Sequence, residues 1–319
     1  MSIDPQTQAF IRQKVLRAVS SNRAPGMHFL GYYLDLAAPC FEKSGVEFVI
    51  EPGPHCTNAH GVANRAVLIY LADIALAGAN RVFSDPNART ATLMLRTEFT
   101  GEPAIGKLTA ICQGSGFSPR TALPESFARG RLMAGGANGR EVMRMSGTWV
   151  APPAPPGRVM SGLPWEGGEN GNQRPLLKKS ELEALEKETV RRFENALRTT
   201  PNGDVLAPLC DPVVKRITNG ATGKLAVGLH IGNRVGHVQG GFLMHAALVT
   251  AEAAVPQHPL LTGASAWYTS PGEGKAITAR ATLLQSGRNV AVVRTELFNA
   301  DRRLVLEVVS NHAVAGRVG

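Results

Sequence analysis

Several signatures that would assign this chain to a common class are absent from its sequence. Its four cysteines, Cys40, Cys56, Cys112 and Cys210, form no C-x-x-C pair, which argues against a zinc knuckle and against a disulfide framework. The first residues contain no apolar core of a secretory signal and carry an acid early, so we expect no signal peptide and a cytoplasmic protein. No apolar run reaches the ~20 residues that span a bilayer, so we expect no membrane partner.

Charged residues are sparse, at 18% of the chain, although the formal net charge is +9. Lysine and arginine form no block and no basic-aromatic motif, which argues against nucleic acid as a partner. A mildly basic surface suits an anionic small ligand equally well. Hydrophobic residues make up 44% of the 319 residues, enough for a globular protein of about two domains.

Familiar catalytic motifs are missing as well. The sequence contains no G-x-S-x-G, no H-E-x-x-H and no dinucleotide-binding glycine pattern. Residues 101–108 imitate a phosphate-binding loop, but Leu108 stands where serine or threonine is required. Pro103 and the absence of a following helix complete the argument against that motif. We therefore expect neither a cofactor nor a metal.

The most informative segment that is present is an apolar run around Asp73. Residues 66–79 are apolar or small except for Tyr70 and Asp73, and no proline interrupts them. This composition predicts a helix that is apolar on all sides and therefore buried. A carboxylate inside such a helix is costly unless it has a partner, a shifted pKa or a function. Asp73 is thus the leading candidate for a catalytic residue.

The predicted elements occur twice in the same order: helix, strand, polar loop, buried helix, then antiparallel strands. Residues 71–75 align with residues 250–254 at a constant offset, which places His60 and Gly61 opposite Gln239 and Gly240. This repeat predicts a duplicated domain. The first copy has a helix over residues 7–20, strands over 46–50, 89–99, 106–113, 130–133 and 141–150, and the second has a helix over 178–198 capped by Ser180, strands over 224–231, 263–269, 276–285, 290–299 and 304–315, and an apolar helix ending at Val255.

Two short motifs carry a resemblance to a known family. The run from Leu71 to Ala79 resembles the central helix of hotdog-fold acyl-CoA thioesterases, in which a His-Gly-Gly turn precedes an Ala-Asp pair. Gln239-Gly240-Gly241 resembles the same turn, with glutamine in place of histidine. The likeness covers residues 45–150 and 223–315. It implies an α+β fold of two hotdog domains in tandem, each an antiparallel sheet wrapped around a long helix, with the sheets joined edge to edge.

The predicted boundaries follow from this resemblance and from composition. Residues 1–155 form hotdog domain 1. Residues 156–177, rich in proline and glycine, form a linker, and residues 178–319 form hotdog domain 2 with its leading charged helix.

Each copy departs from the family pattern in a different way. Nine residues before Asp73 stands Asn64, followed by Arg65, so the first copy lacks His-Gly-Gly, and His60-Gly61 is a displaced alternative. In the second copy the only nearby acid is Glu252. The resemblance implies that the turn of one domain faces the acid of the other. We therefore expect one catalytic site, formed by Asp73 and the Gly240-Gly241 turn.

The predicted function is hydrolysis of acyl-CoA or acyl-carrier thioesters, with Asp73 as general base or nucleophile and the glycine amides binding the carbonyl oxygen. Two alternatives stay open: a 3-hydroxyacyl thioester dehydratase or hydratase, whose typical signatures are missing, and a non-catalytic protein that binds acyl thioesters. A homo-oligomer of double-hotdog units is also left open. The predicted catalytic residues are Asp73, Gly240, Gly241, Gln239 and Asn64, and the predicted substrate-binding residues are Asn58, His60, Asn233 and Arg288.

Overall fold

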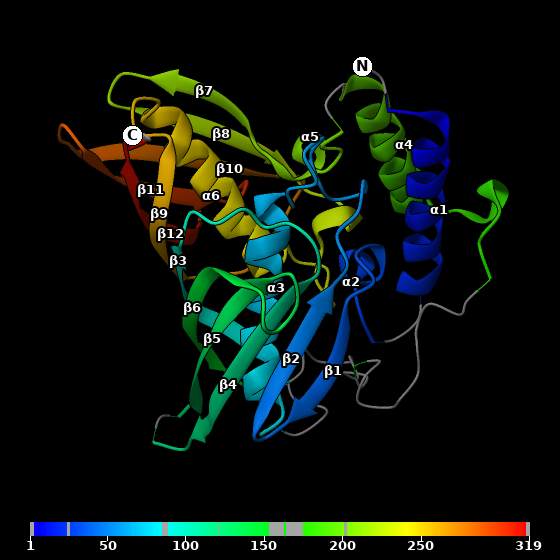
Figure 1. Ribbon diagram of the computed structural model, residues 1–319, viewed down its shortest axis with the longest axis horizontal. Helices are drawn as coiled ribbons and strands as arrows, with labels where there is room; N and C mark the ends of the chain where they lie inside the picture. The colour runs from blue at the N-terminus through cyan, green and yellow to red at the C-terminus, as the bar shows by residue number, and fades with distance from the viewer. Residues whose placement is uncertain are drawn as a thin grey trace.

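Two buried helices, α3 (Arg65–Arg81) and α6 (Gly240–Ala254), lie at the centre of the structure and contact each other. A single antiparallel sheet curves around them (Figure 1). The computed structural model describes residues 3–23, 26–84, 89–120, 122–152, 163, 175–200 and 203–316. Within these residues no helix is long and apolar enough to cross a membrane.

Helix α3 is the buried helix that the apolar run predicts. Asn64 caps it, because its side-chain oxygen accepts a hydrogen bond from the Ala66 amide at 2.8 Å. Leucine, isoleucine and alanine side chains surround the helix, and Asp73 in its middle is only 5% exposed. The prediction of a carboxylate inside a buried helix is therefore confirmed.

Helix α6 approaches α3 very closely at its first turn. A Cβ atom on Gly241 would lie 2.9 Å from both the Ile69 carbonyl oxygen and the Tyr70 Cα atom. Backbone cannot move aside as a flexible side chain can, so this crossing requires glycine. The two glycines at the start of α6 thus bring the beginning of one helix against the middle of the other.

The sheet contains the same strand order twice, in opposite directions, among the described residues. Strands β3 and β9 pair antiparallel at its centre, with Leu95 opposite Ala266. The order across the sheet is β1-β2-β4-β5-β6-β3-β9-β12-β11-β10-β8-β7. The bounds are β1 (Ala37–Glu42), β2 (Gly45–Ile50), β3 (Ala91–Phe99), β4 (Leu108–Ser118), β5 (Glu125–Ala134), β6 (Arg140–Val150), β7 (Val213–Ile217), β8 (Gly220–Ala226), β9 (Leu260–Tyr268), β10 (Ala276–Ser286), β11 (Val290–Phe298) and β12 (Leu304–Ala313).

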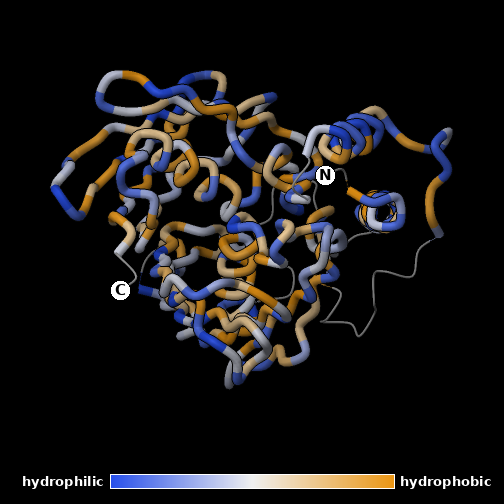
Figure 2. The backbone as a smooth tube through the Cα atoms, turned by 45° about the horizontal axis from the view of Figure 1, so that its top comes forward, coloured by the Kyte–Doolittle hydropathy of each residue, from blue (hydrophilic) through white to orange (hydrophobic). Residues whose placement is uncertain are grey.

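Further helices pack beside the central pair. Helix α1 (Pro5–Asn22) lies alongside α4 (Ala184–Thr199), as Figure 1 shows, and the Arg23 guanidinium contacts the Glu186 carboxylate at 2.6 Å. Figure 2 shows hydrophobic and hydrophilic residues interspersed along the chain. The remaining short elements are α2 (Phe29–Tyr33), α5 (Ala207–Cys210) and the 3-10 turns η2 (Lys179–Glu181) and η3 (Leu229–Ile231).

Several predicted element boundaries are wrong. Strand β5 covers Glu125–Ala134 and not only residues 130–133, and β4 continues to Ser118 instead of ending at residue 113. Helix α4 begins at Ala184 because Glu183 and Glu186 form its capping box, whereas Ser180 lies in the separate turn η2. The strand predicted over residues 224–231 ends at Ala226, and residues 229–231 form a 3-10 turn instead. Most of the predicted linker, residues 156–177, lies outside the described residues, so the domain boundaries stay a prediction.

The predicted alignment of the two copies is also wrong at the central helices. The structure caps α3 with Asn64 and α6 with Gln239, so these two residues correspond, rather than His60 and Gln239. Counted from the caps, Asp73 corresponds to Leu248 and not to Glu252. Helix α6 therefore has no acid at the position that corresponds to Asp73, and Glu252 lies four residues further along the helix.

Candidate active site

A cavity of about 340 Å³ lies beside Asp73, between the two halves of the sheet. One wall is a stripe of α3 that includes Ile74, Ala77 and Gly78. The other walls come from residues 89–93 at the start of β3, residues 233–240 before and at the start of α6, and residues 268–272 after β9. Both halves of the chain therefore contribute to one cavity.

Asp73 is held by three hydrogen-bond donors, all of them neutral. The Thr92 hydroxyl donates to Oδ1 at 2.9 Å, and the Gln239 amide nitrogen donates to Oδ2 at 2.6 Å. The backbone N–H of Gly241 donates to the same carboxylate. Thr92 belongs to β3, whereas Gln239 and Gly241 belong to the start of α6. Among the described residues no Lys, Arg or His forms an ion pair with Asp73.

The environment of Asp73 changes its acidity. Burial raises the pKa of Asp73 to about 6, while hydrogen bonds from Thr92, Gly241 and Gln239 oppose that rise by stabilising the carboxylate. A carboxyl group with a pKa near the working pH is ionised at neutral pH and accepts a proton more readily than an ordinary aspartate. The raised pKa of Asp73 is of the kind that a general base has.

Gly240 packs closely against the Asp73 carboxylate, so that any larger residue there would displace neighbouring side chains. A Cβ atom there would be 2.8 Å from Asp73 Oδ2 and 3.3 Å from Tyr268 Cε1. The Tyr268 hydroxyl donates to the Gly240 carbonyl oxygen at 2.9 Å, which holds this turn in place. Since Gly240 is the first residue of α6, its N–H has no acceptor within the helix and is available to a ligand.

The structure brings together five of the residues selected from the sequence. Asp73, Gln239, Gly240 and Asn233 line the cavity, and Gly241 contacts Asp73 through its amide. Asn233 also shapes the loop before α6, because its side-chain oxygen accepts from the Val235 and His237 amides, each at 3.0 Å. The role of the Gly240 and Gly241 amides in binding a carbonyl oxygen stays a prediction.

The other four selected residues lie elsewhere. Asn64 caps α3 and donates to the Asp204 carboxylate at 2.8 Å, and Asn58 accepts from the His60 and Val62 amides within its own loop. His60 is exposed, and Arg288 is exposed in the hairpin between β10 and β11. None of Asn64, Asn58, His60 or Arg288 lines the cavity. The arginines that do line it are Arg81, Arg89 and Arg234.

Thr92 is the residue of the carboxylate network that sequence reasoning missed. It is an ordinary threonine in a strand, nineteen positions from Asp73, and no motif marks it. Its contact with Asp73 exists because β3 passes alongside the middle of α3. Within the described residues no group of three or more potential ligands is placed to hold a metal ion.

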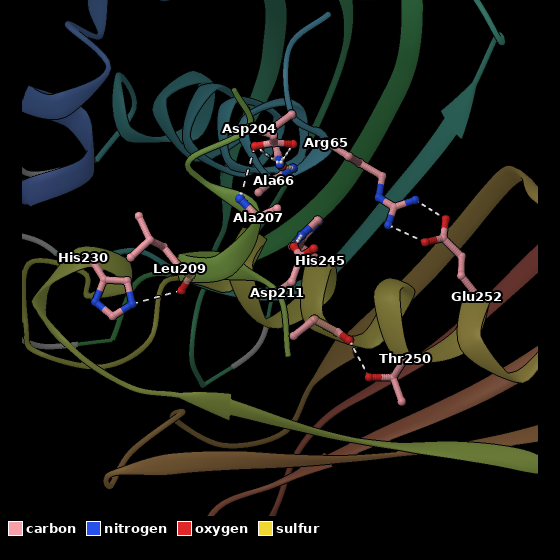
Figure 3. A network of polar contacts seen from close by, with 12 residues as sticks. Arg65, Ala66, Asp204, Ala207, Leu209, Asp211, His230, His245, Thr250 and Glu252 are labelled. Carbon is pink, nitrogen blue, oxygen red and sulfur yellow. Dashed lines mark hydrogen bonds and ion pairs between the residues drawn. The ribbon is translucent and has the colours of Figure 1, made fainter. Parts of the chain in front are cut away.

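The start of α3, which corresponds to the start of α6, carries an ion pair. Arg65, the first residue of α3, reaches across to Glu252 on α6, and its Nη2 contacts Oε2 at 2.7 Å (Figure 3). Arg65 takes the place that Gly240 takes at the start of α6. Nearby, His245 contacts the Asp211 carboxylate at 2.6 Å, and Asp204 accepts from the Ala207 amide.

Comparison with known proteins finds thioesterases both by sequence and by fold. Residues 231–315 match a family model described as the acyl-CoA thioesterase N-terminal domain. No curated protein matches the chain. Three similar solved structures are a candidate oleoyl thioesterase from Lactobacillus plantarum (TM-score 0.55, 15% identity, 86% of this chain and 98% of that one), a candidate thioesterase from Novosphingobium aromaticivorans (0.54, 12%, 88% and 98%) and the 12:0-ACP thioesterase from Umbellularia californica (0.51, 11%, 84% and 93%).

These findings confirm the predicted resemblance to hotdog-fold acyl-CoA thioesterases and, at the level of that family, the prediction of a thioester hydrolase. The sequence match covers only the second half of the chain and leaves out Asp73. For the first half the likeness rests on the fold, since the identities to the solved structures are low.

Proposed function

We propose that this chain is a double-hotdog thioesterase that hydrolyses acyl-CoA or acyl-carrier thioesters with Asp73 as general base. One observation carries the proposal: a buried carboxylate, bonded by neutral donors, faces a cavity at the start of a helix from the other half of the chain. A purely structural carboxylate would not need an adjoining cavity. It also would not need a glycine beside it at a position where a Cβ atom would come within 2.8 Å of Asp73 Oδ2.

The repeated strand order supports the tandem architecture. Each half contains one long buried helix, and strands β1 to β6 follow the same spatial order as β7 to β12. Joining the halves through β3 and β9 pairs two edge strands that would otherwise be exposed to aggregation. The same junction brings Thr92 of β3 and the start of α6 to opposite sides of Asp73.

The first chemical step is the attack of water on the thioester carbonyl carbon. In the proposed mechanism Asp73 accepts a proton from this water while the oxygen of the water forms the new C–O bond. Thr92 and Gln239 fix the carboxylate in one orientation. The Gln239 amide has a second N–H and the Thr92 hydroxyl has free lone pairs, so both can also hold the water.

The second step is collapse of the tetrahedral intermediate. Its oxyanion accepts a hydrogen bond from the Gly240 N–H, where the positive end of the α6 dipole adds to the stabilisation. The C–S bond then breaks, and Asp73 returns its proton to the departing sulfur. The products are a carboxylic acid and a thiol, and the carboxylate of Asp73 is regenerated.

The proposal is tested by turnover of the full chain on a panel of acyl-CoA thioesters and acyl-carrier thioesters. Release of free thiol is followed with a thiol reagent, and formation of a double bond is followed by ultraviolet absorbance on the same samples. We expect thiol release without unsaturation. Unsaturation with the thioester intact would identify a dehydratase instead, and tight binding without either product would identify a binding protein.

A further inference from the structure

Two buried nitrogen-bearing side chains line the cavity without a hydrogen-bond partner among the described residues. They are His28, which is 4% exposed, and Trp149, which is 0% exposed. Both ring nitrogens of His28 and the indole Nε1 of Trp149 are unpaired there. Leaving a buried polar group unsatisfied costs ~1–3 kcal/mol, so native proteins retain few of them without a reason. Their position on the cavity wall points to a ligand.

His28 packs against a residue of α3 that lies about one helical turn from Asp73. Its ring packs edge-on against Tyr70 with 5.5 Å between the ring centroids, and Tyr70 precedes Asp73 by three residues on α3. Burial, assisted by the nearby Arg234, lowers the pKa of His28 to about 3, so the imidazole is neutral at physiological pH. A neutral imidazole offers one N–H donor and one nitrogen acceptor.

Trp149 lies beside the reacting centre on the neighbouring strand. It is the register partner of Thr92 across β6 and β3, and Thr92 holds the Asp73 carboxylate. Partners directly opposite each other have Cβ atoms about 5 Å apart. The indole of Trp149 lines the cavity beside Thr92 and carries a single N–H donor.

The nearby walls are largely apolar and include Ile74, Ala77 and Leu243. A plain alkyl chain in this space would displace any water and leave His28 and Trp149 unsatisfied. Resting on the proposed thioesterase function, we propose that the cavity selects acyl groups that carry a hydroxyl or oxo oxygen within the first few carbons of the thioester carbonyl. His28 and Trp149 are the specificity-determining residues.

A hydroxyl group fits both side chains by its hydrogen-bonding capacity. It can donate to the free nitrogen of His28 and accept from the N–H of either His28 or Trp149. An oxo group accepts from both N–H groups. Sites that hydrogen-bond a substrate oxygen discriminate strongly against analogues that lack it, because the buried protein groups are then left unpaired.

His55 supplies a matched control. It is 2% exposed, both of its ring nitrogens are unpaired among the described residues, and its ring packs edge-on against Tyr33 at 5.4 Å. Burial lowers the pKa of His55 to about 3, as it does for His28. His55 does not line the cavity. A difference between the two histidines therefore reports on the ligand and not on burial.

The test compares kcat/KM for a 3-hydroxyacyl-CoA with that for the saturated acyl-CoA of the same chain length. We expect the wild type to favour the hydroxylated substrate by roughly 5- to 150-fold, the range that corresponds to ~1–3 kcal/mol. His28→Leu and Trp149→Phe should each reduce that ratio severalfold or more. His28→Gln, which keeps a donor and an acceptor, should retain most of it, and His55→Leu should leave it unchanged. The ratio on one sample is independent of how much of a variant folds.

Three outcomes would overturn the inference. The first is a wild-type ratio of kcat/KM near one. The second is an equal loss of kcat/KM on both substrates in His28→Leu, which would assign His28 to the coenzyme arm common to both. The third is an equal change of the ratio in His28→Leu and His55→Leu. If no thioester is hydrolysed, the proposed function fails. The inference is then decided by the ratio of the affinities of the same two thioesters, measured by calorimetry in the wild type and in the same variants.

Discussion

The two helix starts at the centre of the molecule are built alike but surrounded differently. Helix α6 begins with Gln239-Gly240-Gly241, and beside it the carboxylate of Asp73 lines an open cavity. Helix α3 begins with Asn64-Arg65-Ala66, and there the Arg65 guanidinium crosses to Glu252 and forms an ion pair. Glycine leaves space for a ligand, whereas arginine occupies the same space with its own side chain.

The difference also determines the state of each acid. Asp73 is held by neutral donors, so burial raises its pKa to about 6 and it can exchange a proton near neutrality. Glu252 is paired with a cation and is partly exposed, with 29% of its side chain accessible. The two helix starts thus differ in both respects: Asp73 lines a cavity and has no cationic partner among the described residues, whereas Glu252 is paired with Arg65.

Exchange of each acid for its amide should give the largest difference in kcat/KM between the two helix starts. We expect Asp73→Asn to lower kcat/KM by about 10³-fold or more, because loss of a general base typically costs 10²–10⁴-fold. Glu252→Gln should change kcat/KM less than about twofold, since a partly exposed ion pair contributes only ~0–1 kcal/mol to stability. Thiol-release kinetics on both variants, with circular dichroism to verify folding, make the comparison. Equal losses would indicate two working sites.

The two helix caps provide the next largest expected effect. Gln239 and Asn64 each cap a central helix through a side-chain oxygen, so replacement by alanine should cost both variants ~1 kcal/mol of stability. Only Gln239 also donates to Asp73, at 2.6 Å. We therefore expect Gln239→Ala to lower kcat/KM by about 10²-fold, as removal of one active-site donor does, while Asn64→Ala keeps wild-type turnover.

Thermal unfolding measured beside the kinetics separates the cap from the catalytic role in this pair. Similar losses of Tm with unequal losses of turnover would support the assignment. Similar losses of both quantities would mean that Gln239 acts only through the stability of α6.

The dependence on pH is the smallest expected effect. The pKa of Asp73, about 6, lies above its ordinary value of 3.8, so the ionised base forms only as the pH rises through about 6. We expect kcat/KM to fall about tenfold for each pH unit below that value and to level off above it. A plateau that extends down to pH 4 would show that Asp73 is not the base.

Stability should change in the opposite direction, because a raised folded-state pKa means that folding favours the protonated acid. This contribution is fully present below pH 3.8 and is lost as the pH rises through about 6. Asp73→Asn, which does not titrate, should therefore gain stability relative to the wild type as the pH is raised. Chemical denaturation of both proteins at pH 4 and pH 8 measures this difference.

The sequence by itself determined the central helix, the buried position of Asp73 and the Gly-Gly turn. These features follow from local composition, because an uninterrupted apolar run can only be a buried helix and a glycine pair permits a close backbone approach. It also predicted most strands and the order of elements in each half. The exact ends of α4 and β8 were missed because local capping and turn geometry compete with the hydrophobic pattern there.

Only the tertiary structure decided which residues meet at the cavity. Thr92, His28 and Trp149 come from three separate elements with no motif, and they converge because β3, β6 and the start of α2 pack around the same stretch of α3. The pairing of Arg65 with Glu252 likewise depends on how two helices cross. A sequence records the side chains of each element, but distances between elements arise from packing, and a site built from several elements exists only at those distances.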